Sequence, residues 1–591
     1  MSFATALGVV DGRGPGDTWH RLLAVFLGLA VVAGLTALTA ALVIVRSERV
    51  RPRELPHLLI AFWSERASGW KMFLLGSLLT LPAFALFMPT LGGDSDSARL
   101  VASILYVQEN GVDYLLETQE VLLPHLVLGP IMAVGSLPGV QAVDVLSVLL
   151  LGGAVSFLAW RLTRSVLAAV AAALALASLP EILERAYLVP MYPTMLALGL
   201  LGVYLAQRAI VAETRSARWR TAVLAGLCLV LSFEAHQVGQ LFLVVTALLV
   251  VTGRPSATLP GLGRVYLAVA VLAVPRVVVN LTEGGFDQFA KNRVDFWITE
   301  GYLQPIQAEF FNLPIRAGLA DYLEGAPRGL FNAWDPPGLL VLALGLVGIL
   351  VMSSRLRRFT LACVCLMVAV ALYRRLPFYP RYFSLLLVGS ALAAGIAFSA
   401  HPRLSSKAGR AVVGLALAGL VVSAAVSYRE TIEKTQVLER ALASSPYARF
   451  ANAIPPGGGV VGTRSQYLNS VATDIRAYGG QFLTEREYVT FLTWPSDRAA
   501  VRVMRRHDAE WVFVPARPWK WVYKYNDVWL IPNHGKSARY HQEVRESPLF
   551  CRVIWAKGGE ALYKLDPAGA DEPAPARGPR RCEPSIAPAR R

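Results

Sequence analysis

The fold is decided where a long apolar run, Met72–Thr90, gives way to a short acidic stretch: Leu91-Gly92-Gly93-Asp94-Ser95-Asp96-Ser97-Ala98-Arg99-Leu100. The apolar run is long enough to cross a bilayer, so both carboxylates emerge at a membrane–water boundary. The two glycines allow the backbone to turn sharply where it leaves the span. The stretch therefore predicts an acidic pair at the mouth of a polytopic membrane protein.

A short amphipathic pattern follows the acidic pair over residues 97–109. Leu100, Val101, Ile104 and Leu105 fall on one helical stripe, and most of the polar side chains fall elsewhere. This pattern is typical of a helix that lies along the membrane surface.

The composition excludes a soluble globular protein. The chain has 591 residues, of which 54% are hydrophobic and only 17% are charged, and its mean hydropathy is +0.46. The net charge of +16 comes from basic clusters between apolar runs. That distribution indicates membrane topology and gives no support to nucleic-acid binding. The first residues show no cleavable signal-peptide pattern, and the Ala/Leu/Val/Arg-rich composition favours a bacterial inner or plasma membrane.

The five cysteines predict no disulfide framework. Cys363 and Cys365 lie inside an apolar run, where small core residues are expected more often than metal ligands.

About twelve membrane spans are expected, with the basic clusters on the cytoplasmic side and the N-terminus outside. The segment 122–137 is expected to be a separate, half-buried interfacial segment, because it carries Pro124, Pro130 and Gly135. Outer loops are expected over 91–121 and 282–337. The expected spans are 22–45, 72–90, 143–160, 166–179, 191–206, a hairpin over 222–251 with a polar outer turn at 232–237, 265–281, 339–352, 361–372, 383–398 and 412–426.

The composition changes near Tyr428 to that of a soluble domain. We expect a transmembrane domain over 1–428, an outer-face α/β domain over 429–566 and a disordered Pro/Ala/Arg-rich tail over 567–591. Strands are expected at 460–462, 511–514, 528–531, 553–555 and 561–565, and helices at 467–478 and 496–506.

The arrangement resembles the GT-C superfamily of integral membrane glycosyltransferases, which includes protein O-mannosyltransferases and lipid A aminoarabinose transferases. The residues that carry the resemblance are Gly92–Ala98, Leu123-Pro124-His125-Leu126, the span Val143–Arg164 with its Arg-x-x-Arg end, Tyr379-Pro380-Arg381-Tyr382 and Met504–Pro515. The resemblance implies sugar transfer from a polyprenyl-phosphate-linked donor to a glycan, lipid or protein acceptor on the outer face, in cell-envelope synthesis.

The resemblance makes Asp94 the expected catalytic base, which deprotonates the acceptor hydroxyl. Asp96 is the second catalytic candidate, although a residue directly before a helix is equally well explained as an N-cap. The Asp-x-Asp spacing could also hold a divalent cation, but two carboxylates alone are a weak metal signal, so no metal site is assigned.

Arg374, Arg375 and Arg381 are expected to bind the donor phosphate, because arginine matches phosphate oxygens bidentately. The alternative is that they anchor span ends to lipid headgroups beside Tyr379 and Tyr382.

Substrate-binding candidates lie at three further places: His125, the hairpin residues Glu234 and His236, and Trp297 with Tyr302 in the long loop. Ionisable residues inside a membrane are functional candidates by default, but at a hairpin tip they are equally explained as solvated turn residues. Aromatic side chains among polar groups suit a sugar-binding lid, or an interfacial loop.

The alternative function is a polytopic transporter or flippase of lipids or sugars. Such proteins usually carry inverted repeats and broken spans in matching halves. The sequence shows no internal repeat, and its polar residues gather on the outer face, so the enzyme is favoured. A polymerase or ligase of surface polysaccharide shares the donor chemistry but lacks the terminal α/β domain as a rule.

Overall fold

The structure is a computed structural model that describes residues 68–86, 101, 104, 122–188, 191–253, 255–282, 334–374, 383–399, 407–443, 446–462, 465–478, 494–514, 523–525, 528–530, 539–566 and 582, with single-residue or two-residue gaps inside some of these ranges. The expected span 22–45 lies outside this part of the chain. Every other expected span coincides with helix in its described residues, so the polytopic α-helical fold is confirmed.

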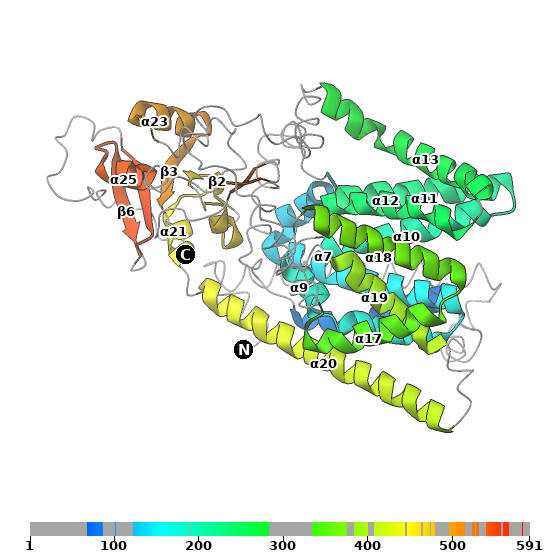
Figure 1. The fold of residues 1–591 in the computed structure, drawn as a ribbon. Coiled ribbons are helices and arrows are strands. Elements are labelled where there is room, and N and C mark those ends of the chain that lie inside the picture. Colours follow the sequence, from blue (N-terminus) through cyan, green and yellow to red (C-terminus); the bar gives the residue numbers. More distant parts are fainter. Residues whose placement is uncertain are drawn as a thin grey trace, which may run out of the picture.

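The membrane part is a bundle of apolar helices (Figure 1). Their bounds are α4 Gly69–Leu79, η2 Leu81–Leu86, α7 Leu122–Thr163, α8 Val166–Ala177, α9 Pro180–Leu188, α10 Tyr192–Val211, α11 Arg215–Ala235, η3 Gln237–Gln240, α12 Leu241–Ala247, η4 Leu248–Thr252, α13 Pro255–Thr282, α17 Asp335–Val351, α18 Ser354–Arg374, α19 Ser384–Ala397 and α20 Lys407–Ala443. Among the described residues, five helices have the length and composition to cross a membrane, and four shorter helices are also apolar.

One expectation about the first outer loop is wrong. Residues 122–137 are not a separate segment, because α7 runs without a break through 42 residues into the following span. The half-buried character is confirmed at its start, where His125 and Leu128 are buried while Leu126 is 59% exposed. Pro130 and Pro138 remove two backbone donors but do not end the helix, which is held by its neighbours.

The basic residues gather at one end of the bundle, where α7 and α10 end and α11, α18 and α20 begin. The C-terminal sheet lies beyond the opposite end (Figure 1). Helix α20 joins the two ends, since its 37 residues measure about 55 Å at 1.5 Å per residue, more than the roughly 30 Å of a hydrocarbon core.

Small residues bring the helices together. Every alanine of α8 is buried, and α8 contacts α4, α7, α19 and α20. Gly348 of α17 lies so close to the Ala393 carbonyl oxygen of α19 that a Cβ could not fit. Such close approach is the usual basis of helix association in lipid.

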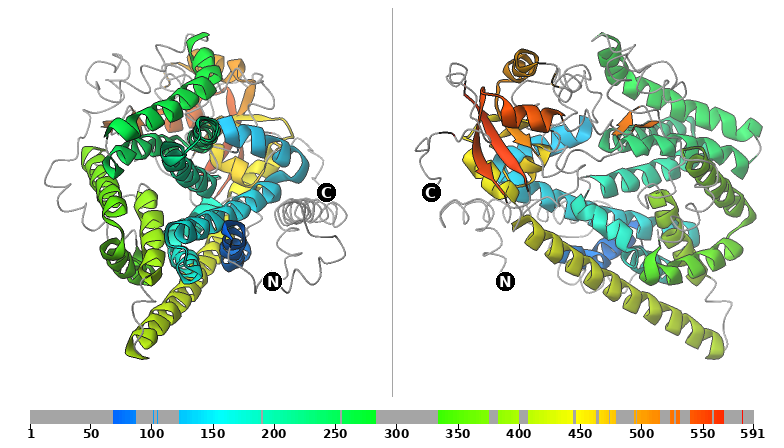
Figure 2. Two further views of the ribbon diagram at one scale, coloured as in Figure 1. Left: turned by 90° about the vertical axis from the view of Figure 1, so that its right-hand side faces the viewer. Right: turned by 60° about the vertical axis from the view of Figure 1, so that its left-hand side comes forward.

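The C-terminal region contains a five-stranded mixed sheet in the order β2-β1-β3-β7-β6 (Figure 2). Strands β2 (Arg476–Tyr478), β1 (Gly459–Val461) and β3 (Ala509–Val514) are parallel, whereas β7 (Ala561–Leu565) and β6 (Phe550–Trp555) are antiparallel to their neighbours. A separate pair joins β4 (Tyr523–Tyr525) to β5 (Val528–Leu530). The helices of this region are α21 (Pro446–Ala453), α23 (Asp497–Arg506) and α25 (Arg539–Glu546).

All five expected strands coincide with observed ones, and the helix expected over 496–506 is observed as α23, with Ser496 as its N-cap. The helix expected over 467–478 is wrong. Only a short 3-10 turn, η7 (Ser465–Ser470), forms there. The Asn469 amide donates to the carbonyls of Ala472 and Ile475, and the chain then pairs with β1 as strand β2.

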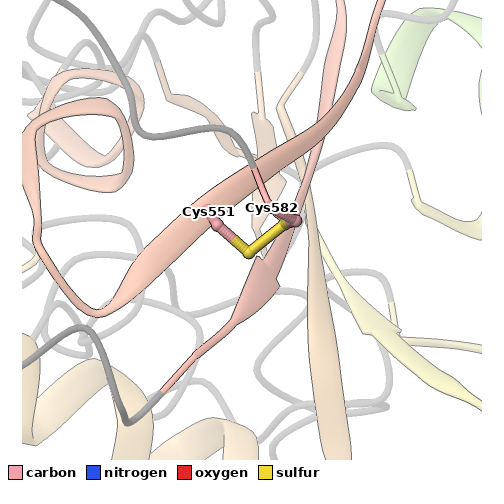
Figure 3. The surroundings of a disulfide bond; sticks show 2 residues. All are labelled: Cys551 and Cys582. Atoms are coloured by element: carbon pink, nitrogen blue, oxygen red, sulfur yellow. A yellow bond between two sulfur atoms is a disulfide. The ribbon is translucent and has the colours of Figure 1, made fainter. Parts of the chain in front are cut away.

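The expectation of no disulfide is also wrong, because Cys551 of β6 is bonded to Cys582 (Figure 3). The backbone N–H of Cys582 donates to the Arg552 carbonyl at 3.3 Å, which fixes this point of the tail beside β6. The rest of the expected disordered tail lies outside the described residues. Cys363 and Cys365 are free, but Cys365 is exposed and Cys363 only half-buried, so the expectation that they are core residues is wrong for Cys365.

The disulfide predicts a definite thiol count. In denatured, unreduced protein, a maleimide-linked polymer should add to three thiols, those of Cys228, Cys363 and Cys365, and to all five cysteines after reduction. Cys582→Ser should lower the stability of the sheet region by about 3–4 kcal/mol, the entropy of an open loop of this length. Five adducts on unreduced protein would exclude the bond.

Candidate functional site

Most of the expected site residues lie outside the described part of the chain: Asp94, Asp96, Arg375, Arg381, Trp297 and Tyr302. Arg374 is the last residue of α18, at the end of the bundle nearest the sheet, and nothing is described of its side chain. The site residues that the structure does describe lie at the ends of helices, at the end of the bundle nearest the sheet.

The helix expected after the acidic pair is described at two positions. Val101 and Ile104 are helical and are 0% and 1% exposed. They pack in one cluster with Leu128 and Val140 of α7 and with Met191. The predicted apolar stripe is confirmed at these two residues, and it meets α7 and the start of α10.

A buried carboxylate lies beside this cluster. Asp144 of α7 is 0% exposed, and its Oδ1 accepts a 2.8 Å hydrogen bond from the backbone N–H of Met191, the N-cap residue of α10. Within the described residues, neither Oδ2 of Asp144 nor the amide of Gln141, one turn earlier, has a hydrogen-bond partner. Polar atoms this deeply buried are rarely left unpaired in proteins.

Met191 has a backbone conformation unusual for its type, with φ of 61°. Residues other than glycine adopt the left-handed region at a cost of order 1–3 kcal/mol, usually where function or packing requires it. The turn carries the ring of Tyr192 to within 4.9 Å of the imidazole of His236, in an edge-to-face contact.

The polar turn of the 222–251 hairpin is observed at His236, between α11 and η3. The His236 Nδ1 accepts from the backbone N–H of Val238 at 3.2 Å and so caps the second helix. Glu234 is only 7% exposed, so this side chain is not a solvated turn residue. The structure therefore brings Asp144, Tyr192 and His236 into one chain of contacts, with Glu234 on the same turn of α11.

His125 lies in the first turn of α7 and is 6% exposed. The neighbouring Leu123, Val127 and Leu128 belong to the cluster around Met191. His125 therefore lies on the segment of α7 that packs against the helix following the acidic pair.

A second set of polar contacts ties α20 to the same end of the bundle. The Lys434 ammonium lies 2.6 Å from Glu184 of α9, and the Tyr428 hydroxyl donates to the Thr80 carbonyl at 3.2 Å. The Lys434 side chain is half exposed, so this ion pair is worth at most about 1 kcal/mol. Its effect is to align α20, and the sheet that follows it, with α9.

The described residues contain no group of three His, Cys, Asp or Glu side chains that could hold a metal ion. Asp94 and Asp96 lie outside the described residues.

Sequence reasoning missed Asp144 and Gln141. Both stand at the start of an apolar run, and a polar or ionisable residue in such a run is the signal that marks them. The pattern does not reveal the partner of Asp144, because Met191 is 47 residues further along the chain.

No protein-family model and no curated protein matches this chain in sequence. In structure, the chain is similar to ArnT from Cupriavidus metallidurans in the apo state and bound to undecaprenyl phosphate, with TM-scores of 0.51 and 0.55. Both comparisons have 13% sequence identity and cover 85% of this chain and 99% of that one. It is also similar to the Archaeoglobus fulgidus oligosaccharyltransferase, with a TM-score of 0.49, 13% identity, and coverage of 86% of this chain and 75% of that one. The similarity to the two ArnT structures confirms the expected fold, a polytopic α-helical membrane protein with a C-terminal region that contains a sheet, and at 13% identity it extends to the fold alone.

The His236 cap gives a prediction about the hairpin. His236→Ala should lower stability by about 0.5–2 kcal/mol because the Val238 N–H loses its acceptor, whereas His236→Asn should stay near the parent because Asn is a good N-cap. Thermal unfolding in detergent measures both variants. Equal melting temperatures for all three proteins would show that the cap contributes nothing.

Proposed function

We propose that this chain is a membrane glycosyltransferase that moves a sugar from a polyprenyl-phosphate-linked donor to an acceptor at the outer face of the membrane. The observation that carries the proposal is the similarity in fold to ArnT bound to undecaprenyl phosphate, which covers 85% of this chain and 99% of that one. The acceptor class is a glycan, lipid or protein of the cell envelope.

Two independent features support an outer-face reaction. Arginine-rich helix ends favour the cytoplasmic side, and in this bundle they lie opposite the sheet (Figure 1). The Cys551–Cys582 disulfide of the sheet region is typical of an oxidising compartment such as the periplasm or cell exterior. Both features favour a location outside the cell for the sheet and for the helix ends nearest to it.

In the proposed reaction, Asp94 accepts the proton of the acceptor hydroxyl as its oxygen attacks the anomeric carbon. The new bond to the acceptor oxygen forms while the bond from the anomeric carbon to the donor phosphate breaks, and the electron pair leaves with the phosphate. A carboxylate just outside the bilayer is partly desolvated, which makes it a stronger base.

Arg381, with Arg374 and Arg375, neutralises the departing phosphate through charge-assisted hydrogen bonds. His125, Glu234 and His236 contribute to substrate binding from the bundle, and Trp297 and Tyr302 stack against the sugar from the long loop. The proposal assigns no step to a metal ion, although the Asp-x-Asp spacing could also hold a divalent cation.

The test compares two acidic residues that stand two positions apart. Asp94→Asn keeps the size of the side chain but removes the proton acceptor, so transfer should fall by about a hundred- to ten-thousand-fold. Asp96→Asn is the matched control and should be far milder, because Asn caps a helix about as well as Asp. The assay follows radiolabel from undecaprenyl-phosphate-linked pentoses and hexoses into acceptor, using the purified full chain.

Near-parental transfer by Asp94→Asn would remove the assignment of the base. A parent chain that transfers from none of these donors, but moves labelled lipid across vesicle bilayers, would establish the transporter instead.

A further inference from the structure

The carboxylate of Asp144 is the least expected polar group in the bundle. It stands about one turn inside the apolar span that begins at Val140, is fully buried and keeps one oxygen without a partner among the described residues. Burying a carboxylate in an apolar region is expensive, so its presence calls for a specific role.

Among the described residues, Asp144 accepts one hydrogen bond, and its donor is the backbone N–H of Met191. Met191 is in the left-handed region at φ of 61°. It is the N-cap residue of α10, but its own side chain makes no capping hydrogen bond. The Asp144 Oδ1 accepts a hydrogen bond from the Met191 N–H at 2.8 Å, at the N-terminus of α10. The bond therefore fixes where α10 begins relative to α7.

Met191 is also the point where three parts of the site meet. Its side chain is buried and packs with Val101 and Ile104, two helical residues that follow the acidic pair in the sequence. The next residue, Tyr192, contacts His236 of the hairpin turn. A shift of Met191 would disturb its packing against Val101 and Ile104 and the Tyr192–His236 contact together.

We propose that Asp144 is a positioning residue, which acts through Met191 to hold the helical residues Val101 and Ile104 in register with the His236 turn. The inference rests on the proposed function, because its consequence for activity is the placement of Asp94. It assigns Asp144 no proton transfer and no contact with substrate.

The role requires a hydrogen-bond acceptor, not a charge. Asp144→Asn offers a carbonyl oxygen to the Met191 N–H and should transfer sugar at close to the parental rate. Asp144→Leu has no acceptor, and because a misplacement of about 1 Å can cost about a hundredfold in rate, transfer should fall by that order.

The matched structural control is Ser147→Ala, one turn further along α7. Ser147 makes a second α7–α10 hydrogen bond, accepting from Thr194 Oγ1 at 2.6 Å, but has no contact with Met191 among the described interactions. Ser147→Ala should lower the melting temperature while transfer, measured well below that temperature, stays near parental. Loss of transfer by Ser147→Ala equal to that of Asp144→Leu would overturn a specific role for Asp144.

A second variant tests whether Asp144 acts through Met191, even if Asp144→Leu does not fold. Met191→Ala keeps the hydrogen bond to Asp144 but removes the side chain that packs against Val101 and Ile104, so transfer should again fall. Parental transfer by Met191→Ala would exclude this route. Transfer lost in Asp144→Asn as completely as in Asp144→Leu would show that the charge matters and would overturn the positioning role.

A readout without activity separates this inference from the proposed function. In a background lacking Cys228, Cys363 and Cys365, a short bis-maleimide should link Val101→Cys to Val140→Cys in the parent and in Asp144→Asn. The link should be lost in Asp144→Leu. Unchanged linking in Asp144→Leu would overturn the positioning role, whereas linking as expected in a chain without any transferase activity would leave positioning intact and count against the proposed function.

Discussion

The close approach of small residues is the constraint on which the bundle depends. Between helices in lipid, apolar burial gives little net gain, so backbones must come close enough for dense packing and interhelical hydrogen bonds. Helix α8 does this with its buried alanines, and Ser156 donates to the Ala169 carbonyl at 2.6 Å where α7 packs beside it. The Ser178 hydroxyl makes the corresponding contact to α20 at the Leu420 carbonyl. The neighbouring helices are arranged around this tightly packed centre.

Because the centre is apolar and tight, polar chemistry is displaced to the two ends of the bundle, and the ends differ. One end carries arginines that stack on aromatic rings, such as Arg164 over Trp160 at 4.7 Å. The other carries the carboxylate–backbone contact of Asp144, the Tyr192–His236 pair and the α20 contacts that lead to the sheet. Asp144 lies about one helical turn inside the apolar span. Its hydrogen bond to Met191, which has a left-handed backbone, explains why a carboxylate is found there.

The sequence was informative where local pattern decides structure. The length of the apolar runs located the described spans, the polar turn at 232–237 located the hairpin, and short apolar runs located β3 and β7. It failed where a distant partner decides. Residues 476–478 form a strand and not a helix because they pair with the parallel strand β1. Helix α7 continues through Pro130 and Pro138 because neighbouring helices support it. Cys551 is bonded to Cys582, which is 31 residues further along the chain. The Asp144–Met191 bond is of the same kind, since its signal in the sequence is only a carboxylate in an apolar run.

The central claim is that the acidic loop and the sheet share the face opposite the arginines, and cysteine accessibility in intact cells tests it most directly. In a background lacking Cys228, Cys363 and Cys365, single cysteines would replace Asp94, the exposed Gln542 of α25 and the exposed Ser216 at the start of α11. The account predicts that an impermeant maleimide labels positions 94 and 542 from outside, and position 216 only after the membrane is opened. Labelling of 94 and 542 from opposite sides would contradict it.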